Sequence, residues 1–409
     1  MSDTATRSLG DEVAAPAASA SPGRRRRPVA LLLGLVAVVV LLLLPFYVES
    51  FWLQVGFGVC GAAVGAIGLN LLVGTTGQLS LAHAFFLAVG ASAYAFVSGD
   101  PGGTATKVGG LGLSPVIGMV AGVLLAGLAG VLFSPIAARL RGIYLGVASL
   151  GLVFVGQHLL NTLTYVTGGF NGRTTPPFAL PGFSFTSSDP DLFVAGVPFG
   201  EAEREWYLGL VLLAAAWWFA HNLLRSRPGR ALQTLRDSET AAAVMGVNVQ
   251  GYKARVFLVS SMYAGLSGVL FALSVGLVSP ESFTLDLSVL FLAMIVLGGL
   301  GSVGGAVAGA VFVQALPRVF ERYADTLPFL SAPGQGGLNA AQGARILFGL
   351  AIILVVLFQP AGLAGLARGR TGRRRRTPTT TTTGTTTSTT ASTTAPSGTS
   401  TAPAQGSTT

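Results

Sequence analysis

The side chains able to do acid–base, metal or redox chemistry are sparse in this sequence of 409 residues. His83 and His158 lie in long apolar stretches, and neither stretch contains an aspartate or a glutamate. Cys60 is the only cysteine, which excludes a disulfide within the chain and a cysteine-based metal cluster. Ion-coupled carriers usually keep a carboxylate or an unwound helix near the membrane midplane. The sequence therefore disfavours an ion-coupled carrier, a redox protein and a membrane-embedded enzyme.

Polar side chains in the middle of the apolar stretch 50–99 form a second group of candidates. These residues are Asn70, Gln78, Ser80 and His83. They can line a polar path through a membrane, or they can make hydrogen bonds between neighbouring helices. The sequence leaves both interpretations open.

A run rich in glycine at 298–305 forms a third group, and its candidates are Gly298, Gly299 and Gly301. A break in a helix at membrane depth is tolerated where it is buried in protein or lines a cavity. We expect these glycines to serve close packing and a helix break. Lining of the transport path is the alternative.

No phosphate-binding motif of the form Gly-x-x-x-x-Gly-Lys-Ser/Thr is present in the sequence. Residues 102–107 supply the glycine and the lysine, but the Gly-Lys-Ser/Thr ending is missing. If ATP powers transport, another chain must therefore supply the ATPase. We expect no bond chemistry, no cofactor and no metal in this chain, which is thus not an enzyme.

The elements that position these residues follow from composition. Apolar residues make up 51% of the chain and charged residues 10%, whereas soluble domains carry roughly 25% charged residues. A charge at the centre of a spanning helix costs about 2.5–3.5 kcal/mol, so charge-free windows of about 20 residues predict spans. The windows are 28–48, 50–99, 108–138, 142–172, 206–224, 256–280, 287–317 and 346–367.

The number of spans follows from the positive charges. Basic clusters precede the first window, follow the last, and occupy 225–255, and such clusters favour the cytoplasmic side. Clusters on the same side of the membrane must be separated by an even number of spans. The windows satisfy this condition if 50–99 divides into two spans near 74–78 and 287–317 divides into two near 298–305. The sequence predicts an all-α integral protein of the cell membrane with about ten transmembrane helices, or eight if two are re-entrant. Both termini are expected in the cytoplasm, and the basic excess indicates topology, with no nucleic-acid partner.

Five segments follow from this topology. Residues 1–27 are expected to form a disordered basic tail, and 28–367 the transmembrane domain. Within that domain, 165–205 is expected outside and 225–255 inside. Residues 368–409 are basic and then rich in threonine, a composition typical of a flexible tail.

The cytoplasmic segment 225–255 shows a helical pattern that opens near Gly229 and ends at Gly246. Polar residues at 237–239 interrupt the pattern, which indicates a second short helix. Taken alone, the segment is either a solvated loop or a helix that docks into a partner.

Short motifs along the chain resemble the permease subunits of ABC importers, in the LivM branch for branched-chain amino acids. In 225–255, the pattern is similar to the coupling (EAA-type) loop of that family. The motifs are Gly229-Arg230-Ala231, Leu235–Glu239, Met245–Asn248, Tyr252-Lys253, Gly68–Leu72, Gly77–His83, Thr167–Gly172 and Val296–Ser302. Ala82 stands where the family usually has glycine, and the threonine-rich tail departs from the pattern.

The resemblance implies an ABC-importer permease fold and a role in transport by alternating access. It implies that the loop touching the ATPase includes Gly229, Arg230, Arg236, Asp237, Glu239 and Gly246. The implied partners are a second, LivH-like permease, two cytoplasmic ATPase subunits, an extracytoplasmic binding protein and membrane lipid. Branched-chain amino acids are the expected substrates, a urea or short-amide permease is the alternative, and an ion-coupled carrier is a more distant one.

Overall fold

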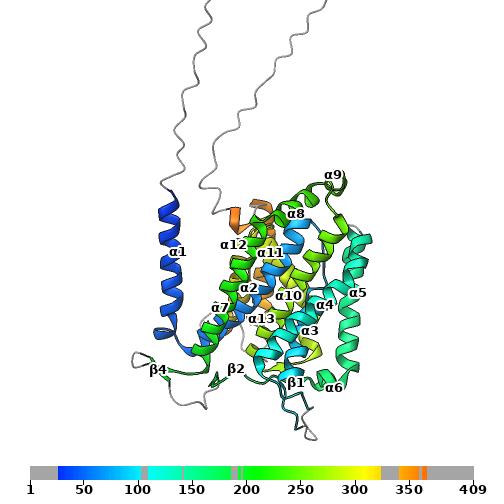
Figure 1. The fold of residues 1–409 in the computed structure, drawn as a ribbon. Coiled ribbons are helices and arrows are strands. Elements are labelled where there is room, and N and C mark those ends of the chain that lie inside the picture. The colour runs from blue at the N-terminus through cyan, green and yellow to red at the C-terminus, as the bar shows by residue number, and fades with distance from the viewer. Residues whose placement is uncertain are drawn as a thin grey trace, which may run out of the picture.

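The structure, a computed structural model, describes residues 26–102, 109–140, 142–185, 192–194, 197–323, 340–358 and 362–365. Of the two expected tails, residues 1–25 and 368–409 lie outside the described residues. The described part is a bundle of helices with short strand pairs at one end (Figure 1).

Two helices form the centre of the bundle, α2 (Ser50–Thr76) and α10 (Val249–Val275). In their most apolar windows, 78% of α2 and 72% of α10 are buried, against 17% of α7 (Glu201–Arg225). The helices α3 (His83–Ser98) and α4 (Pro115–Arg139) pack on α10. A methyl group at Gly90 would collide with the backbone of Gly265, so glycine lets α3 and α10 touch directly.

Three helices lie at the periphery: α1 (Arg26–Leu43), α5 (Ile143–Thr162) and α13 (Ala340–Phe358). Figure 1 shows α1 standing apart from the bundle, joined through η1 (Leu44–Phe46). Its last turn accepts a hydrogen bond from the Trp206 indole, which reaches the carbonyl of Leu41 over 3.1 Å. The large apolar side chains described on α1, from Leu32 to Leu43, are exposed, as expected of a helix that faces lipid.

Both helix breaks that the sequence predicts are present. Gly77, with a φ of 69°, ends α2, and residues 77–82 are non-helical before α3 begins. Between α11 (Leu285–Gly298) and α12 (Val303–Tyr323), Gly299 and Gly301 have φ values of 110° and 79°. Five described helices are long and apolar enough to cross a membrane, α2, α4, α5, α7 and α10, and several shorter apolar helices accompany them. The count of ten spans stays a prediction.

The end of the bundle opposite α8 (Arg227–Asp237) carries the segment expected outside, 165–205 (Figure 1). Its short elements are α6 (Thr164–Thr167), η2 (Gly169–Asn171), β1 (Arg173–Thr174), β2 (Ala179–Leu180), β3 (Phe183–Ser184), β4 (Leu192–Val194) and β5 (Val197–Phe199). The antiparallel pairs are β1 with β6 (Leu277–Val278), β2 with β3, and β4 with β5. The turn η3 (Pro280–Phe283) follows β6.

Arg173 anchors this outer segment to the helices. Its buried guanidinium donates to the carbonyls of Gly109 at 2.7 Å and Tyr165 at 3.1 Å. It also lies over the ring of Phe96, 5.1 Å from the centroid. Burial lowers the pKa of the Arg173 guanidinium, and the carbonyls that surround the group compensate for the lost hydration.

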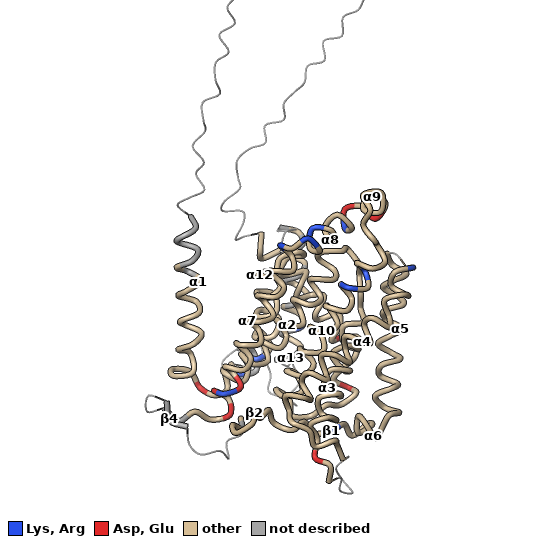
Figure 2. Tube along the Cα trace, in the orientation of Figure 1, with Lys and Arg blue, Asp and Glu red and all other residues tan. Residues whose placement is uncertain are grey.

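Charges divide between the two ends of the described bundle (Figure 2). Lysine and arginine gather along α8 and the neighbouring helix ends, whereas most acidic residues lie at the opposite end. Acidic residues also occur at the junction of α8 with α9 (Glu239–Val244). This asymmetry matches the pattern expected when the α8 end faces the cytoplasm.

Candidate functional site

The segment 225–255 folds as the sequence predicts, into two short helices that lead into α10. The first, α8, begins at Arg227, where the Ser226 hydroxyl accepts a hydrogen bond from the backbone N–H of Gly229. The second, α9, begins after Ser238, whose hydroxyl accepts from Ala241 at 3.2 Å. Gly246, with a φ of 80°, follows the end of α9. The last residues of the segment, from Val249, already belong to α10.

One face of α8 packs against the bundle. Leu232 and Leu235 are buried there, and so is Gly229. A methyl group at Gly229 would collide with the carbonyls of Leu223 and Leu224 at the end of α7. Glycine at this position therefore lets α8 fold back directly onto α7.

Arg236 connects α8 to the core, at a site that we call the inner joint: Asn70, Gly74, Arg236 and Gly301. The guanidinium of Arg236 donates to the carbonyl of Gly74 at 2.8 Å. The N–H of Gly301, in the break between α11 and α12, donates to Oδ1 of the buried Asn70 at 2.9 Å. The inner joint thus links α8, the end of α2 and the α11–α12 break.

The inner joint is tightly packed around Gly74. A methyl group at Gly74 would collide with Oδ1 of Asn70 and with the backbone of Gly301. On Gly301, an added Cβ would lie 3.4 Å from Nη1 of Arg236. A shift of α8 would therefore act on the end of α2 and, through the close approach of Gly74 to Gly301, on the α11–α12 break.

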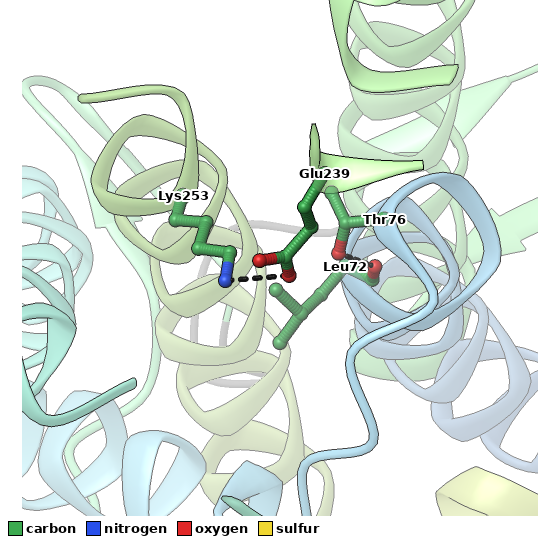
Figure 3. A network of polar contacts seen from close by, with 4 residues as sticks. All are labelled: Leu72, Thr76, Glu239 and Lys253. Carbon is green, nitrogen blue, oxygen red and sulfur yellow. Dashed lines mark hydrogen bonds and ion pairs between the residues drawn. The ribbon is translucent and has the colours of Figure 1, made fainter. Parts of the chain in front are cut away.

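A buried ion pair fastens α9 to α10 (Figure 3). Nζ of Lys253 lies 2.7 Å from Oε1 of Glu239. Lys253 is 1% exposed, and this carboxylate is the partner that compensates its burial. Figure 3 shows the last turn of α2, with Leu72 and Thr76, beside the pair. Glu239, predicted as a contact to the ATPase, points inward to the ion pair.

The other face of the segment is open. Arg230, Asp237 and Gly246 are exposed there, as expected of residues that meet a partner. At the tip of α9, Val244 is 89% exposed and Met245 63% exposed. This outer face of α8–α9 combines exposed apolar side chains with charges of both signs, a composition that suits a protein interface.

The α2–α3 connection carries the buried polar candidates Gln78 and Ser80, and the buried His83 is the first residue of α3. The His83 ring packs edge-on against Phe291 of α11, with centroids 4.8 Å apart, and Phe291 also fills the space above Gly65. Gly65 precedes the end of α2 by 11 residues, or about 16 Å of helix. The non-helical connection therefore descends into the membrane core, where such backbone must be buried in protein or line a cavity.

Gln78 and His83 differ from the other buried polar residues in this region. Among the described residues, neither side-chain atom of Gln78 has a hydrogen-bond partner, and the same holds for Nε2 of His83. Ser80, in contrast, accepts a hydrogen bond from the N–H of Ala82 at 3.4 Å. Buried polar groups without a protein partner usually meet water or a ligand.

The remaining glycine candidates serve helix contact. A methyl group at Gly298 would collide with the carbonyl of Gly305, so α11 and α12 touch through their backbones. A methyl group at Gly362 would likewise collide with the backbone of Gly299. This geometry agrees with the packing interpretation, and Gly301 alone of the three belongs to the inner joint.

The structure also shows a cleft at the opposite end of the bundle, which the sequence analysis missed. This outer cleft has a polar mouth lined by Gln54, Ser274, Gln314 and Arg318. An apolar interior continues from it between α2, α10, α11 and α12. The available signal was a glutamine within each of the windows 50–99 and 287–317, because amide side chains are costly in lipid.

Comparison with known proteins places the chain in a family. Residues 59–357 match the family described as "Branched-chain amino acid transport system / permease component". The chain is 32% identical over 316 residues to the Escherichia coli K12 high-affinity branched-chain amino acid transport system permease protein LivM, covering 74% of this chain and 67% of that protein.

Two further relatives extend the comparison. Identity is 24% to a probable branched-chain amino acid transport permease protein LivM of Methanocaldococcus jannaschii, over 78% of this chain and 90% of that one. Identity is 28% to the Escherichia coli ribose import permease protein RbsC, over 59% of this chain and 67% of that protein. No solved structure matches the chain. This multi-pass membrane protein therefore belongs to the family of permease components of branched-chain amino acid transport systems.

Proposed function

We propose that this chain is the membrane-spanning permease subunit of an ATP-driven ABC importer for branched-chain amino acids. It would work with a second, LivH-like permease, two cytoplasmic ATPase subunits and an extracytoplasmic binding protein, in the lipid of the cell membrane. The observation that carries the proposal is the inner joint, which connects an exposed helical segment to the end of α2 and to the helix break between α11 and α12.

The two faces of α8–α9 suit the two tasks of a coupling element. The outward face, with Arg230, Asp237 and Val244, would receive the ATPase. Charges there would set orientation and association rate more than affinity. Two contacts to the bundle, the hydrogen bond of the exposed Arg236 and the ion pair of Glu239, would pass the movement of the ATPase to α2, α10 and the α11–α12 break. The cycle of ATP binding and hydrolysis would then switch the spans between outward- and inward-open states.

The transport path would run beside the α2–α3 connection. Gln78 and His83 support this position, because they bring polar atoms without described protein partners to membrane depth. The charges of the described residues support an orientation with the α8 end in the cytoplasm (Figure 2). The basic clusters near both ends of the sequence support the same side for the two termini.

The test is solute uptake by the transporter assembled with its partner subunits in proteoliposomes. We expect accumulation of leucine that requires internal ATP, survives dissipation of ion gradients, and is lost when the ATPase subunits carry an inactive nucleotide site. Urea accumulation without leucine accumulation would favour the short-amide alternative. Leucine uptake that persists without ATP and follows an ion gradient would contradict the proposal.

A further inference from the structure

The outer cleft is a cavity that none of the roles above explains. It opens where α2 begins and α10 ends, at the opposite end of the bundle from the inner joint. Its mouth has a volume of about 160 Å³, whereas a single water needs about 10–15 Å³. The mouth therefore has enough volume for a small hydrated solute.

The mouth of the cleft offers donors and acceptors around one positive charge. Of the described residues that line it, Arg318 alone carries a charge, and Gln314 lies one turn before it on α12. A guanidinium can bind a carboxylate through two parallel hydrogen bonds. The amide of Gln54 and the hydroxyl of Ser274 supply acceptors that suit an ammonium group.

The interior of the cleft has a different character. Beyond the residues shared with the mouth, it is lined by Phe271, Leu287, Leu290, Phe291 and Met294. These aromatic and aliphatic side chains favour an apolar group of similar shape. Phe291 lines this interior, and His83, the first residue of α3, packs against the same ring.

Gly58 keeps the passage between mouth and interior open. A Cβ added there would lie 3.6 Å from Oγ of Ser274 and 3.7 Å from Nε2 of Gln314. These are ordinary contact distances, so alanine fits without strain. A longer side chain would project into the cleft, because Gly58 lines both its mouth and its interior.

We propose that the outer cleft is a transit subsite for an α-amino acid with a branched aliphatic side chain. Arg318 binds the carboxylate, the neutral polar residues of the mouth hold the ammonium group, and the side chain enters the apolar interior. This inference rests on the proposed function and deepens it, because urea offers neither a carboxylate nor an apolar group. The subsite binds weakly, since a solute in transit must also leave.

The test measures kcat/KM for leucine uptake by the assembled transporter in proteoliposomes, together with its ATPase rate. Arg318→Gln is expected to lower kcat/KM by about tenfold or more, since it removes a charge-assisted bidentate contact, while ATP hydrolysis continues. Arg318→Lys should recover part of the loss. The matched control is Arg322→Gln, because Arg322 lies one turn further on α12 and pairs only loosely, at 3.7 Å, with the exposed Glu49. We expect this control to transport as wild type does.

A second pair of variants tests the shape of the cleft without touching a charge. Gly58→Leu should lower uptake by about tenfold or more by filling the passage, and Gly58→Ala should leave it unchanged. Equal uptake by Arg318→Gln and Arg322→Gln, or by the two Gly58 variants, would overturn the subsite while leaving the proposed function in place. A wild-type transporter that accumulates no leucine would overturn the proposed function, and the subsite with it.

Discussion

The two ends of the bundle are built in opposite ways. At the inner joint, no methyl group fits at Gly74, and hydrogen bonds of 2.8 and 2.9 Å join Arg236 to Gly74 and Gly301 to Asn70. At the outer cleft, Gly58 leaves open space between polar side chains. An end that receives mechanical input must be tightly packed, because voids absorb displacement. An end that receives solute must instead admit water. In this chain, glycine therefore allows close backbone packing at one end of the bundle and leaves open space at the other.

The largest effect is expected from breaking the ion pair beside the inner joint. Glu239→Ala leaves the buried Lys253 without its carboxylate, which should lower the free energy of unfolding by about 3 kcal/mol, the lower end for a buried pair since Glu239 is partly exposed. Thermal unfolding in detergent measures this loss. The double variant Glu239→Ala/Lys253→Met should recover most of it, because methionine buries no charge. A double variant as unstable as the single one would show that the pair is not the cause.

The packing of the inner joint gives the next effect. Gly74→Ala places a methyl group against Asn70 and Gly301 and should destabilise the protein by about 2 kcal/mol through overpacking. Gly151→Ala is the matched control, since a Cβ at Gly151 on α5 meets nothing within 4 Å. The same detergent unfolding assay compares the two variants. Equal midpoints would refute the tight packing of this joint.

The outward face of α8–α9 should respond in binding and not in stability. Val244→Asp puts a charge on a side chain that is 89% exposed, so the fold should be unaffected. If the ATPase docks there, its dissociation constant should rise about tenfold, or about 1.4 kcal/mol. Co-purification at graded ATPase concentrations measures the shift. Gln233→Asp, on an exposed position of α8, offers a comparison for added charge alone.

Cysteine labelling compares the water access of the outer cleft with that of the packed core, and it requires the smallest change in stability. In a Cys60→Ser background, Ser274→Cys in the outer cleft should react with a membrane-impermeant thiol reagent. Ser261→Cys on the same helix should not, because Ser261 is buried against Gly130. Ser274→Cys should change stability by less than about 0.5 kcal/mol, because Ser274 is exposed. Unreactive Ser274→Cys would mean that water does not enter the cleft.

Local rules made several features of this fold predictable. The breaks at Gly77 and at Gly299–Gly301 follow from positive φ angles that glycine adopts readily. The division of 225–255 into two helices follows from Ser238, a capping residue in the middle of the pattern. In each case the residue that predicts the helix end or helix start lies within a few positions of it in the sequence.

The partners of the candidate residues were not predictable in the same way. Arg236 meets Gly74, which is 162 positions away in the chain, and Asn70 meets Gly301 across 231 positions. The inward direction of Glu239 depends on how deeply the first turns of α10 are buried. The outer cleft gathers Gln54, Ser274 and Gln314 from three helices. Such sites depend on how helices pack, which periodicity and charge do not specify.

The ratio of leucine transported to ATP hydrolysed, measured for Arg236→Gln in the assembled transporter, tests the inner joint most directly. This variant removes the hydrogen bond from α8 to Gly74 while leaving Arg230, Asp237 and Val244 of the outward face unchanged. We predict that ATPase binding and hydrolysis stay near wild-type levels and that the transport ratio falls by about tenfold, the loss expected for one hydrogen bond to a charged group. An unchanged ratio would contradict the transmission of movement through this joint.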